Sequence, residues 1–376
     1  MPVPLPAPNE TLLVPPDEAE AEFVARGIAA AVAPTGGLTP LQSVLLDALF
    51  DSLTGFRVDL HQPPIDPRSF ALGLACRNEA FRGRVLQMMI LTALVLRPLP
   101  KEVADRLTSF AAELSVGDGM LKVAQEYARG HLGLAAVDFQ RNGYTSDWEH
   151  AHREALHTSS ELEEAWELAV KDPELAARWE ALEALPEGTL GRRVTEFYRA
   201  RGFVYPGRPG SAPPLLAQHD WVHVLADYGT KVESELEVFA FIARANDDPK
   251  AFSLLAMVVS LFETGYMRTG AGLFEASPGQ LSHEGVAVRV ADALRRGALC
   301  TGSVDFMTTD WFELAALPVE EARERFGVVA KSVGAVVAGS VSPWEAGGIS
   351  EYQERTGRAL ADGEGRVYEG YGATVS

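Results

Sequence analysis

The sequence predicts an all-α protein of two helical domains with a flexible tail at each end. Apolar residues recur at helical spacing along most of the chain, strand-like alternation is nearly absent, and Pro- and Gly-containing breakers separate the helical blocks at ordinary loop lengths. At about 100–200 residues per domain, 376 residues indicate two domains. Hydrophobic residues make up 47% of the chain, which is enough for packed cores and excludes a wholly disordered chain.

The N-terminal domain is predicted over residues 18–170. Its first helix, Glu18–Val32, has helical propensity throughout and is stopped by a Pro-Thr-Gly-Gly turn. Thr39 is suited to cap the next helix, with Pro40 at the first helical position. Further helices are expected at Ser69–Asn78, Phe81–Arg97, Lys101–Ser115, Gly119–Asn142 and Ser146–Val170.

The second helical domain is predicted over residues 180–330, interrupted by the Pro- and Gly-rich loop Tyr205–Pro214. Residues 1–17 hold six Pro and no Lys or Arg, so they indicate a flexible tail rather than a secretion signal. Residues 331–376 hold much Gly and little apolar periodicity, so we expect a second, irregular tail there.

Charge and cysteine content exclude several classes of protein. The formal net charge is −19, and no run of basic residues is denser than an Arg pair, so nucleic acid is not expected as a partner. Cys76 and Cys300 lie far apart without metal-ligand spacing, which argues against a disulfide framework and a thiolate zinc site. The apolar stretches fall short of the ~20 residues that span a bilayer. We therefore expect a cytoplasmic protein with at most peripheral membrane contact.

The strongest chemical signal is the run Gln218-His219-Asp220-Trp221-Val222-His223. On a helix, at about 100° per residue, His219, His223 and Asp220 project at roughly 0°, 40° and 100° and therefore share one face. Imidazole and carboxylate groups suit zinc or a similar divalent ion. The alternative is that Asp220 favours the helix N-terminal dipole and His223 is a satisfied core histidine.

A fourth ligand must come from another segment, and three carboxylates follow at Glu233, Glu235 and Glu237. In one continuous helix, Glu235 would lie about 18 Å along the axis from His223, too far to share an ion. Gly229-Thr230 supplies a break at which a second helix could fold back. The metal hypothesis therefore requires that return.

The pair of histidines and Asp220, followed after eleven residues by Glu235, resembles the motif of the coenzyme Q biosynthesis protein 4 family. The flanking Val224-Leu225 and Val232-Glu233 fit as well. Further matching stretches are Leu185–Arg192, Ala293–Gly297, Asp310–Glu313 and Leu317–Arg323, so the resemblance covers roughly residues 180–330. It implies an all-helical domain that binds a divalent metal, usually zinc, through His219, Asp220, His223 and Glu235, which are also the candidate catalytic residues.

This family acts in ubiquinone biosynthesis, where it is associated with removing the C1 carboxyl of a polyprenylated hydroxybenzoate and with organising other biosynthetic enzymes. The resemblance thus implies a metal-dependent decarboxylase, a carbon–carbon lyase. Its expected partners are a prenylated aromatic acid or isoprenoid lipid, other biosynthetic enzymes, and a second copy in a homodimer. The alternative is a non-catalytic scaffold that binds prenyl lipid and holds a structural metal.

Other features carry weaker hypotheses. An HD-type phosphohydrolase would use His219-Asp220 with His157 upstream and Asp247 or Asp248 downstream. A second metal site could use His150, Glu154 and His157, although a polar, solvated helix face is the favoured interpretation.

Two further segments have both a structural and a functional interpretation. The apolar segment Phe252–Phe262 could line an isoprenoid groove, but a core helix is favoured. Residues 40–144 loosely resemble tellurite-resistance protein B-like helical domains in size and pattern. Their carboxylates are scattered and form no acidic metal cluster in the sequence, so a packing, docking or dimerisation role is expected as much as chemistry.

Overall fold

The computed structural model of the protein describes residues 15–96, 100–116, 171–209, 211–212, 214–246, 255, 258–259, 266–269, 272–275, 280–302 and 304–373. The predicted helices Gly119–Asn142 and Ser146–Val170 lie outside these residues, as does most of the predicted N-terminal tail. Statements on structure below concern the described residues.

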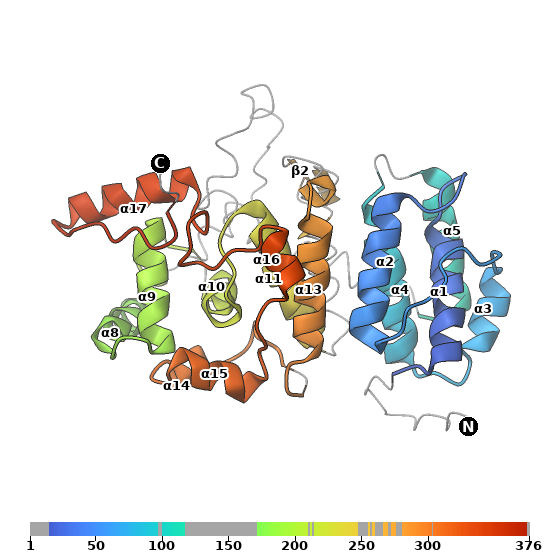
Figure 1. The fold of residues 1–376 in the computed structure, drawn as a ribbon, viewed down its shortest axis with the longest axis horizontal. Helices are drawn as coiled ribbons and strands as arrows, with labels where there is room; N and C mark the ends of the chain where they lie inside the picture. The colour runs from blue at the N-terminus through green and yellow to red at the C-terminus, as the bar shows by residue number, and fades with distance from the viewer. Residues whose placement is uncertain are drawn as a thin grey trace.

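The all-α class is confirmed (Figure 1). The described α-helices are α1 (Glu18–Val32), α2 (Pro40–Thr54), α3 (Pro67–Gly73), α4 (Glu79–Leu94), α5 (Lys101–Glu113), α8 (Pro173–Ala181), α9 (Leu190–Arg201), α10 (Pro214–Ala226), α11 (Val232–Ala245), α13 (Val286–Ala298), α14 (Trp311–Leu314), α15 (Val319–Phe326), α16 (Val333–Val337) and α17 (Glu351–Gly363). Short 3-10 turns lie at Leu182–Ala184 and Gln280–Ser282.

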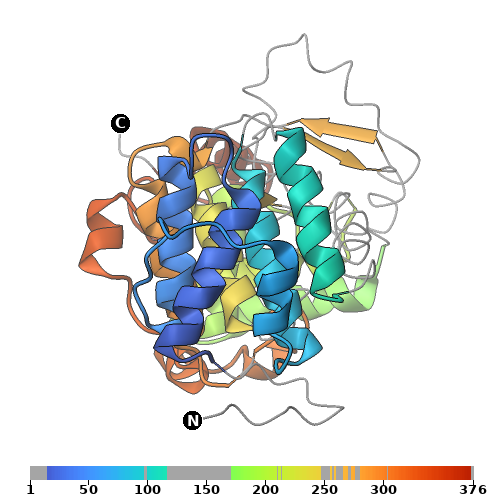
Figure 2. The same cartoon turned by 90° about the vertical axis from the view of Figure 1, so that its right-hand side faces the viewer.

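One short antiparallel ribbon accompanies the helices, drawn as two orange arrows in Figure 2. Its strands are β1 (Tyr266–Thr269) and β2 (Gly272–Glu275), with Tyr266 opposite Glu275 and Thr269 opposite Gly272. A two-stranded ribbon of this length does not change the fold class.

Helices α1 to α5 form an N-terminal bundle whose first turns follow local signals in the sequence. Thr39 caps α2 by accepting a hydrogen bond from the Gln42 amide, and the Gln42 side chain returns the contact to the Thr39 backbone. Gln42 is fully buried, and its side-chain amide also donates to the carbonyl oxygens of Val32 and Thr92 at 3.0 and 3.2 Å. This one side chain therefore ties α1, α2 and α4 together.

The second helical region is built around α10, α11 and α13, with α13 facing the N-terminal bundle through α2 (Figure 1). Leu49 of α2 and Leu294 of α13 are both fully buried and belong to one continuous hydrophobic core. At the same boundary, Arg84 donates to the Asn246 carbonyl at 3.2 Å. The predicted division into residues 18–170 and 180–330 stays a prediction, and the two parts share a packed boundary.

The prediction of an irregular tail over residues 331–376 is wrong for its described part. Ser350 begins α17 with a complete capping box to Gln353, and α17 packs on α9. A Cβ at Gly357 would lie 2.3 Å from the Ala200 carbonyl oxygen, so the absence of a side chain permits this approach. Some of the glycines that suggested disorder here, Gly357 among them, serve close packing instead.

No described helix is both long enough and apolar enough to cross a membrane.

The contact between α17 and α9 can be tested with two glycines of α17. In Gly357→Ala, the added methyl meets the Ala200 carbonyl, so we expect the free energy of unfolding to fall by about 1–3 kcal/mol. Gly363→Ala is the matched control because no atom lies within 4 Å of its added Cβ, and it should change stability by less than about 1 kcal/mol. Urea titrations measure both, and equal effects would contradict the docked position of α17.

Candidate metal centre

Helix α10 lies at the centre of the second region and carries both histidines of the motif. It packs against α9, α11 and α15, and its residues Val222, Val224, Leu225 and Ala226 are all buried. Most of α10 therefore lies in the core. His219, Asp220 and His223 are completely buried, at 0% exposure.

The chain reverses direction between α10 and α11, as the metal hypothesis requires. Helix α10 ends at Ala226, Asp227 adopts a left-handed conformation with φ of 66°, and α11 begins at Val232. Asp is one of the few residues other than Gly that visit this conformation readily. The predicted break at Gly229-Thr230 is confirmed, and it brings Glu235 back beside the histidines.

The C-terminal segment braces this reversal. The amides of Gly229 and Thr230 donate to the carbonyl oxygens of Val341 and Gly348, each at 3.0 Å. A Cβ at Gly229 would lie 2.9 Å from the Gly348 Cα, so the two backbones touch. The residues that the sequence assigned to a tail thus help to set where α11 starts.

Arg201, at the end of α9, is fully buried and joins the same loop. Its Nε donates to Thr230 Oγ1 at 2.8 Å, and its Nη2 donates to the carbonyl oxygens of Pro343 and Gly348 at 3.2 and 3.1 Å. The guanidinium also lies 3.9 Å from the centre of the Phe197 ring. Sequence reasoning missed Arg201 because its hydrogen-bond partners in this loop and in the C-terminal segment are 29 to 147 positions away along the chain.

Three of the four predicted ligands converge. Glu235 Oε1 lies 3.3 Å from His223 Nε2, and Glu235 Oε2 lies 3.6 Å from His219 Nε2. One ligand atom from each of these residues lies within 4.8 Å of the others. Two imidazoles and one carboxylate are the donor set of many catalytic zinc sites, which keep a further position for water or substrate.

Each imidazole is oriented by a backbone carbonyl. His219 Nδ1 lies 2.5 Å from the Leu216 carbonyl oxygen, and His223 Nδ1 lies 3.2 Å from that of Tyr228. A carbonyl oxygen only accepts, so Nδ1 carries a proton in both rings, and in the neutral form of each ring Nε2 presents a lone pair towards Glu235. This is the arrangement of histidines that bind a metal.

The lone pairs provide a test of whether an ion fits. His223 Nε2 is buried and makes no hydrogen bond, and the nearest acceptor is the Glu235 carboxylate at 3.3 Å. Two acceptor atoms at this distance repel unless a proton or a cation lies between them. A divalent cation would satisfy both, so the residues present fit a metal.

The surroundings of Glu235 favour an ionised carboxylate. Burial alone would raise the pKa of Glu235, but a positive charge on the adjacent imidazoles of His223 and His219 outweighs it and holds the pKa well below its usual range, and a cation held between neutral imidazoles would act in the same direction. Phe239 stacks on the His219 ring at 5.3 Å between centroids, and Phe197 stacks on the His223 ring at 5.5 Å. The two aromatic rings shield the cluster and strengthen its electrostatic interactions.

Asp220 lies beside the three-residue cluster rather than in it. Its Oδ1 is 3.7 Å from His219 Nε2, while its Oδ2 accepts a hydrogen bond from the Tyr198 hydroxyl at 2.5 Å. The ligand role of Asp220 stays a prediction. Tyr198 comes from α9, 22 positions away, and no local pattern pointed to it.

The other two carboxylates of α11 have different partners. Glu237 pairs with Arg289 at 2.6 Å, and Glu233 lies 3.7 Å from the exposed His283. At about 100° per residue, positions 233 and 237 lie on one face of a helix and position 235 lies on nearly the opposite face, so the three carboxylates cannot all face α10. Helical spacing separates Glu235 from the other two, and packing decides that Glu235 faces the histidines.

Several weaker hypotheses fall outside the described residues. His150, Glu154 and His157 lie there, as do Asp247 and Asp248, so the second metal site and the phosphohydrolase dyad stay untested. Of the apolar segment Phe252–Phe262, only Leu255, Val258 and Val259 are described, and all three are buried.

Comparison with known proteins does not show the family or the function of this chain. No model of a known protein family matches the chain, and no curated protein matches it. Among solved structures, the chain is similar to a protein of Nostoc punctiforme that was provisionally named a ubiquinone biosynthesis protein. The identity is 19%, the alignment covers 66% of this chain and 98% of that one, and the TM-score is 0.30. A likeness this weak assigns neither fold nor function.

Metal binding can be tested by replacing two ligands at once. Wild-type protein loaded with zinc and desalted should keep about one ion per chain, and His219→Ala/His223→Ala should keep almost none because carboxylates without the two imidazoles bind zinc weakly. His283→Ala is the matched control, since His283 is exposed and lies outside the cluster. Metal content is measured by mass spectrometry, and equal zinc in the wild type and the double variant would refute the site.

Proposed function

We propose that this protein is a divalent-metal-dependent decarboxylase of the ubiquinone-biosynthesis type, acting on a prenylated hydroxybenzoate or a related aromatic acid. The observation that carries the proposal is the convergence of ligand atoms from His219, His223 and Glu235 within 4.8 Å. The sequence motif around these residues supports the reaction class, because it resembles the coenzyme Q biosynthesis protein 4 motif.

In this proposal the metal is held by His219 Nε2, His223 Nε2 and a carboxylate oxygen of Glu235. A bound divalent ion would act as a Lewis acid that stabilises negative charge on the substrate carboxylate or phenolate. The chain's own residues would orient the substrate, exclude water and deliver a proton.

Asp220 is the residue best placed to handle that proton. Its Oδ2 is held by the Tyr198 hydroxyl, and its Oδ1 lies beside the imidazole of His219. In its protonated form, Asp220 would give the proton from Oδ1 to the ring carbon that bears the carboxyl group. The bond between that carbon and the carboxyl then breaks, its electron pair stays with the ring, and carbon dioxide leaves.

Tyr198 would act as a positioning residue in this step. By donating to one carboxylate oxygen, it fixes the rotamer of Asp220 and leaves the other oxygen for the substrate. Tyr198 is itself fully buried and packs against Trp179 at 4.9 Å between ring centroids. Its hydroxyl therefore has little freedom to move away from Asp220.

The Asp220 role can be tested with an isosteric variant. Asp220→Asn keeps the size of the side chain but cannot carry the proton, so we expect normal zinc content and turnover lowered about 10²–10⁴-fold. Tyr198→Phe should lower turnover less and keep zinc. Product formation from candidate prenylated hydroxybenzoates is followed by mass spectrometry. Undiminished turnover by Asp220→Asn would rule out this role.

A second candidate function is a non-catalytic prenyl-lipid scaffold with a structural metal. The observation that favours it is burial, since His219, Asp220, His223 and Glu235 are all at most 1% exposed. In addition, neither of the two described cavities, of about 320 and 270 Å³, is lined by any of these four residues. A closed site with Asp220 as fourth ligand would hold metal without turnover, and Asp220→Asn would then lose zinc rather than retain it.

A further inference from the structure

His223 differs from His219 in what orients its imidazole. The carbonyl oxygen beside Nδ1 of His219 belongs to Leu216, which lies in the same helix, α10. The carbonyl oxygen beside Nδ1 of His223 belongs to Tyr228, which lies past the end of α10, in the reversal before α11. The helix therefore sets the direction of one imidazole, whereas the other depends on a residue outside the helix.

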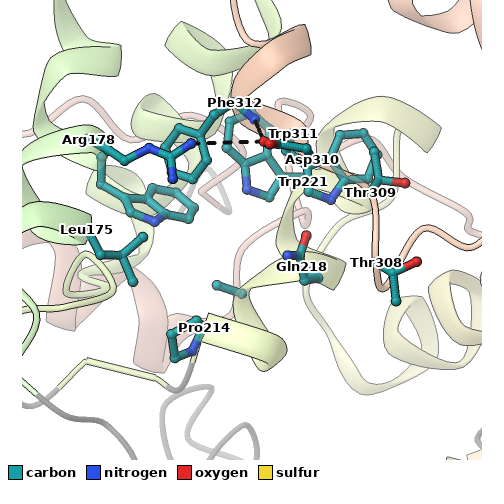
Figure 3. Close-up of a pocket in the computed structure, with 12 residues that line it drawn as sticks. Leu175, Arg178, Pro214, Gln218, Trp221, Thr308, Thr309, Asp310, Trp311 and Phe312 are labelled. Atoms are coloured by element: carbon teal, nitrogen blue, oxygen red, sulfur yellow. Dashed lines mark hydrogen bonds and ion pairs between the residues drawn. The ribbon is translucent and has the colours of Figure 1, made fainter.

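The helix that carries both histidines is held in place by its own contacts. At about 100° per residue, Trp221 projects from the face opposite the histidines. There it stacks on Trp311 at 5.8 Å between ring centroids, with the planes 3° apart (Figure 3). At the C-terminal end of α10, the Ala226 carbonyl oxygen accepts a hydrogen bond from Arg296 at 2.8 Å, and a cation suits this end of a helix. What these contacts leave open is the direction of the His223 ring.

Stacking on Phe197 limits the plane of the His223 ring but not the edge that faces Glu235. The two rings lie 5.5 Å apart between centroids and 28° from parallel. A half-turn about the Cβ–Cγ bond would keep this contact and put a ring carbon in place of Nε2 beside the carboxylate. The hydrogen bond from Nδ1 to the Tyr228 carbonyl, at 3.2 Å, distinguishes the two orientations. The direction of His223 therefore depends on where that carbonyl lies.

The side chain of Tyr228 is held by its ring rather than by its hydroxyl group. Tyr228 is fully buried, and its hydroxyl finds no hydrogen-bond partner among the described residues. Two cations lie over the ring, the Arg296 guanidinium at 4.8 Å and Lys331 Nζ at 5.5 Å from the ring centroid. The face of an aromatic ring attracts a cation, and the attraction is stronger where water is excluded.

Both cations are themselves tied to other segments. Arg296, in α13, is buried and also donates to the Val329 carbonyl oxygen at 2.8 Å. The Lys331 side chain, from the segment between α15 and α16, is only 6% exposed and lies 3.4 Å from the Asp227 carboxylate. The ring of Tyr228 therefore packs against groups that have little room to move, and its backbone is restrained with it.

We propose that Tyr228 is a positioning residue for the metal ligand His223. Its ring, held by Arg296 and Lys331, fixes the backbone carbonyl that accepts the hydrogen bond from Nδ1, so that Nε2 faces Glu235. Without the ring, the imidazole also adopts the half-turn in which a carbon faces the carboxylate, and the site loses a ligand. The proposal rests on the metal site of the proposed function and not on the decarboxylation.

The zinc affinity of two variants separates the ring from the hydroxyl. Tyr228→Phe keeps the ring and should bind zinc within about twofold of the wild type, since the lost hydroxyl makes no hydrogen bond. Tyr228→Leu removes the ring and should bind zinc about 10–100-fold more weakly, as when a group that orients a ligand is lost. Competition with a chromophoric chelator measures both on the full chain. Equal weakening in the two variants, or unchanged affinity in Tyr228→Leu, would overturn the proposal.

Phe306→Leu is the matched control for the loss of a buried ring. Phe306 is fully buried, and its ring partners among the described residues are Phe241, Trp311 and Phe326. This variant should lose stability in urea much as Tyr228→Leu does, yet keep the zinc affinity of the wild type. The visible spectrum of cobalt-loaded protein, which reports the geometry around the ion, should change in Tyr228→Leu alone. The same changes in Phe306→Leu would reduce Tyr228 to a packing role and overturn the proposal.

Lys331→Met tests the cation, and it gives a result even if Tyr228→Leu does not fold. Methionine has a long, unbranched side chain without the charge, and Arg296 still lies over the ring, so we expect zinc binding about threefold weaker. In the Tyr228→Leu background the same change should add nothing, because the cation acts through the ring. Unchanged affinity in Lys331→Met would overturn the proposal. An equal loss in both backgrounds would do so too, by assigning the effect to the ion pair with Asp227.

The outcomes also separate this proposal from the proposed function. Wild-type protein that binds no zinc would overturn both. Zinc binding without turnover of any prenylated hydroxybenzoate would count against the decarboxylase alone. Wild-type zinc affinity and an unchanged cobalt spectrum in Tyr228→Leu would count against the positioning role alone.

Discussion

The architecture of the second helical region depends on the return of α11 beside α10, which places a carboxylate against two imidazoles in the core. A straight continuation would have carried Glu235 about 18 Å from His223. The reversal at residues 227–231 avoids this, and it is held by contacts from far along the chain. Arg201 reaches it from α9, and Val341 and Gly348 receive its amides.

Burying Glu235 between His219 and His223 is costly unless a cation completes the group. Charged and polar atoms removed from water lose their hydration, and their mutual contacts offset this loss only when all are satisfied. Here the Nδ1 protons of both imidazoles are donated to backbone carbonyl oxygens, which turns the Nε2 side of each ring towards the carboxylate. The ion that we propose would complete this arrangement, and Asp220 with Tyr198 forms the adjoining hydrogen-bonded pair.

Local signals in the sequence predicted much of the fold. The bounds of α1 and the start of α2 follow from helix formers, caps and breakers that lie within a few residues of one another. The return of Glu235 was also predictable, because the length of a helical turn limits which residues can share an ion. The wrongly predicted C-terminal tail shows the limit of such reasoning. Its glycines were interpreted as disorder, whereas Gly357 permits a close contact with a helix more than 150 positions earlier.

The contributions of Tyr198 and Arg201 could not be predicted for the same reason, since their partners are fixed by packing of distant segments. X-ray absorption spectroscopy of zinc-loaded protein tests the central claim most directly, because it reports the ligands around the ion itself. The account predicts two imidazole nitrogens at about 2.0–2.1 Å and at least one carboxylate oxygen at about 2.0–2.2 Å. It also predicts loss of the imidazole signal in His219→Ala/His223→Ala. A zinc environment without imidazole, or one that the double substitution leaves unchanged, would contradict it.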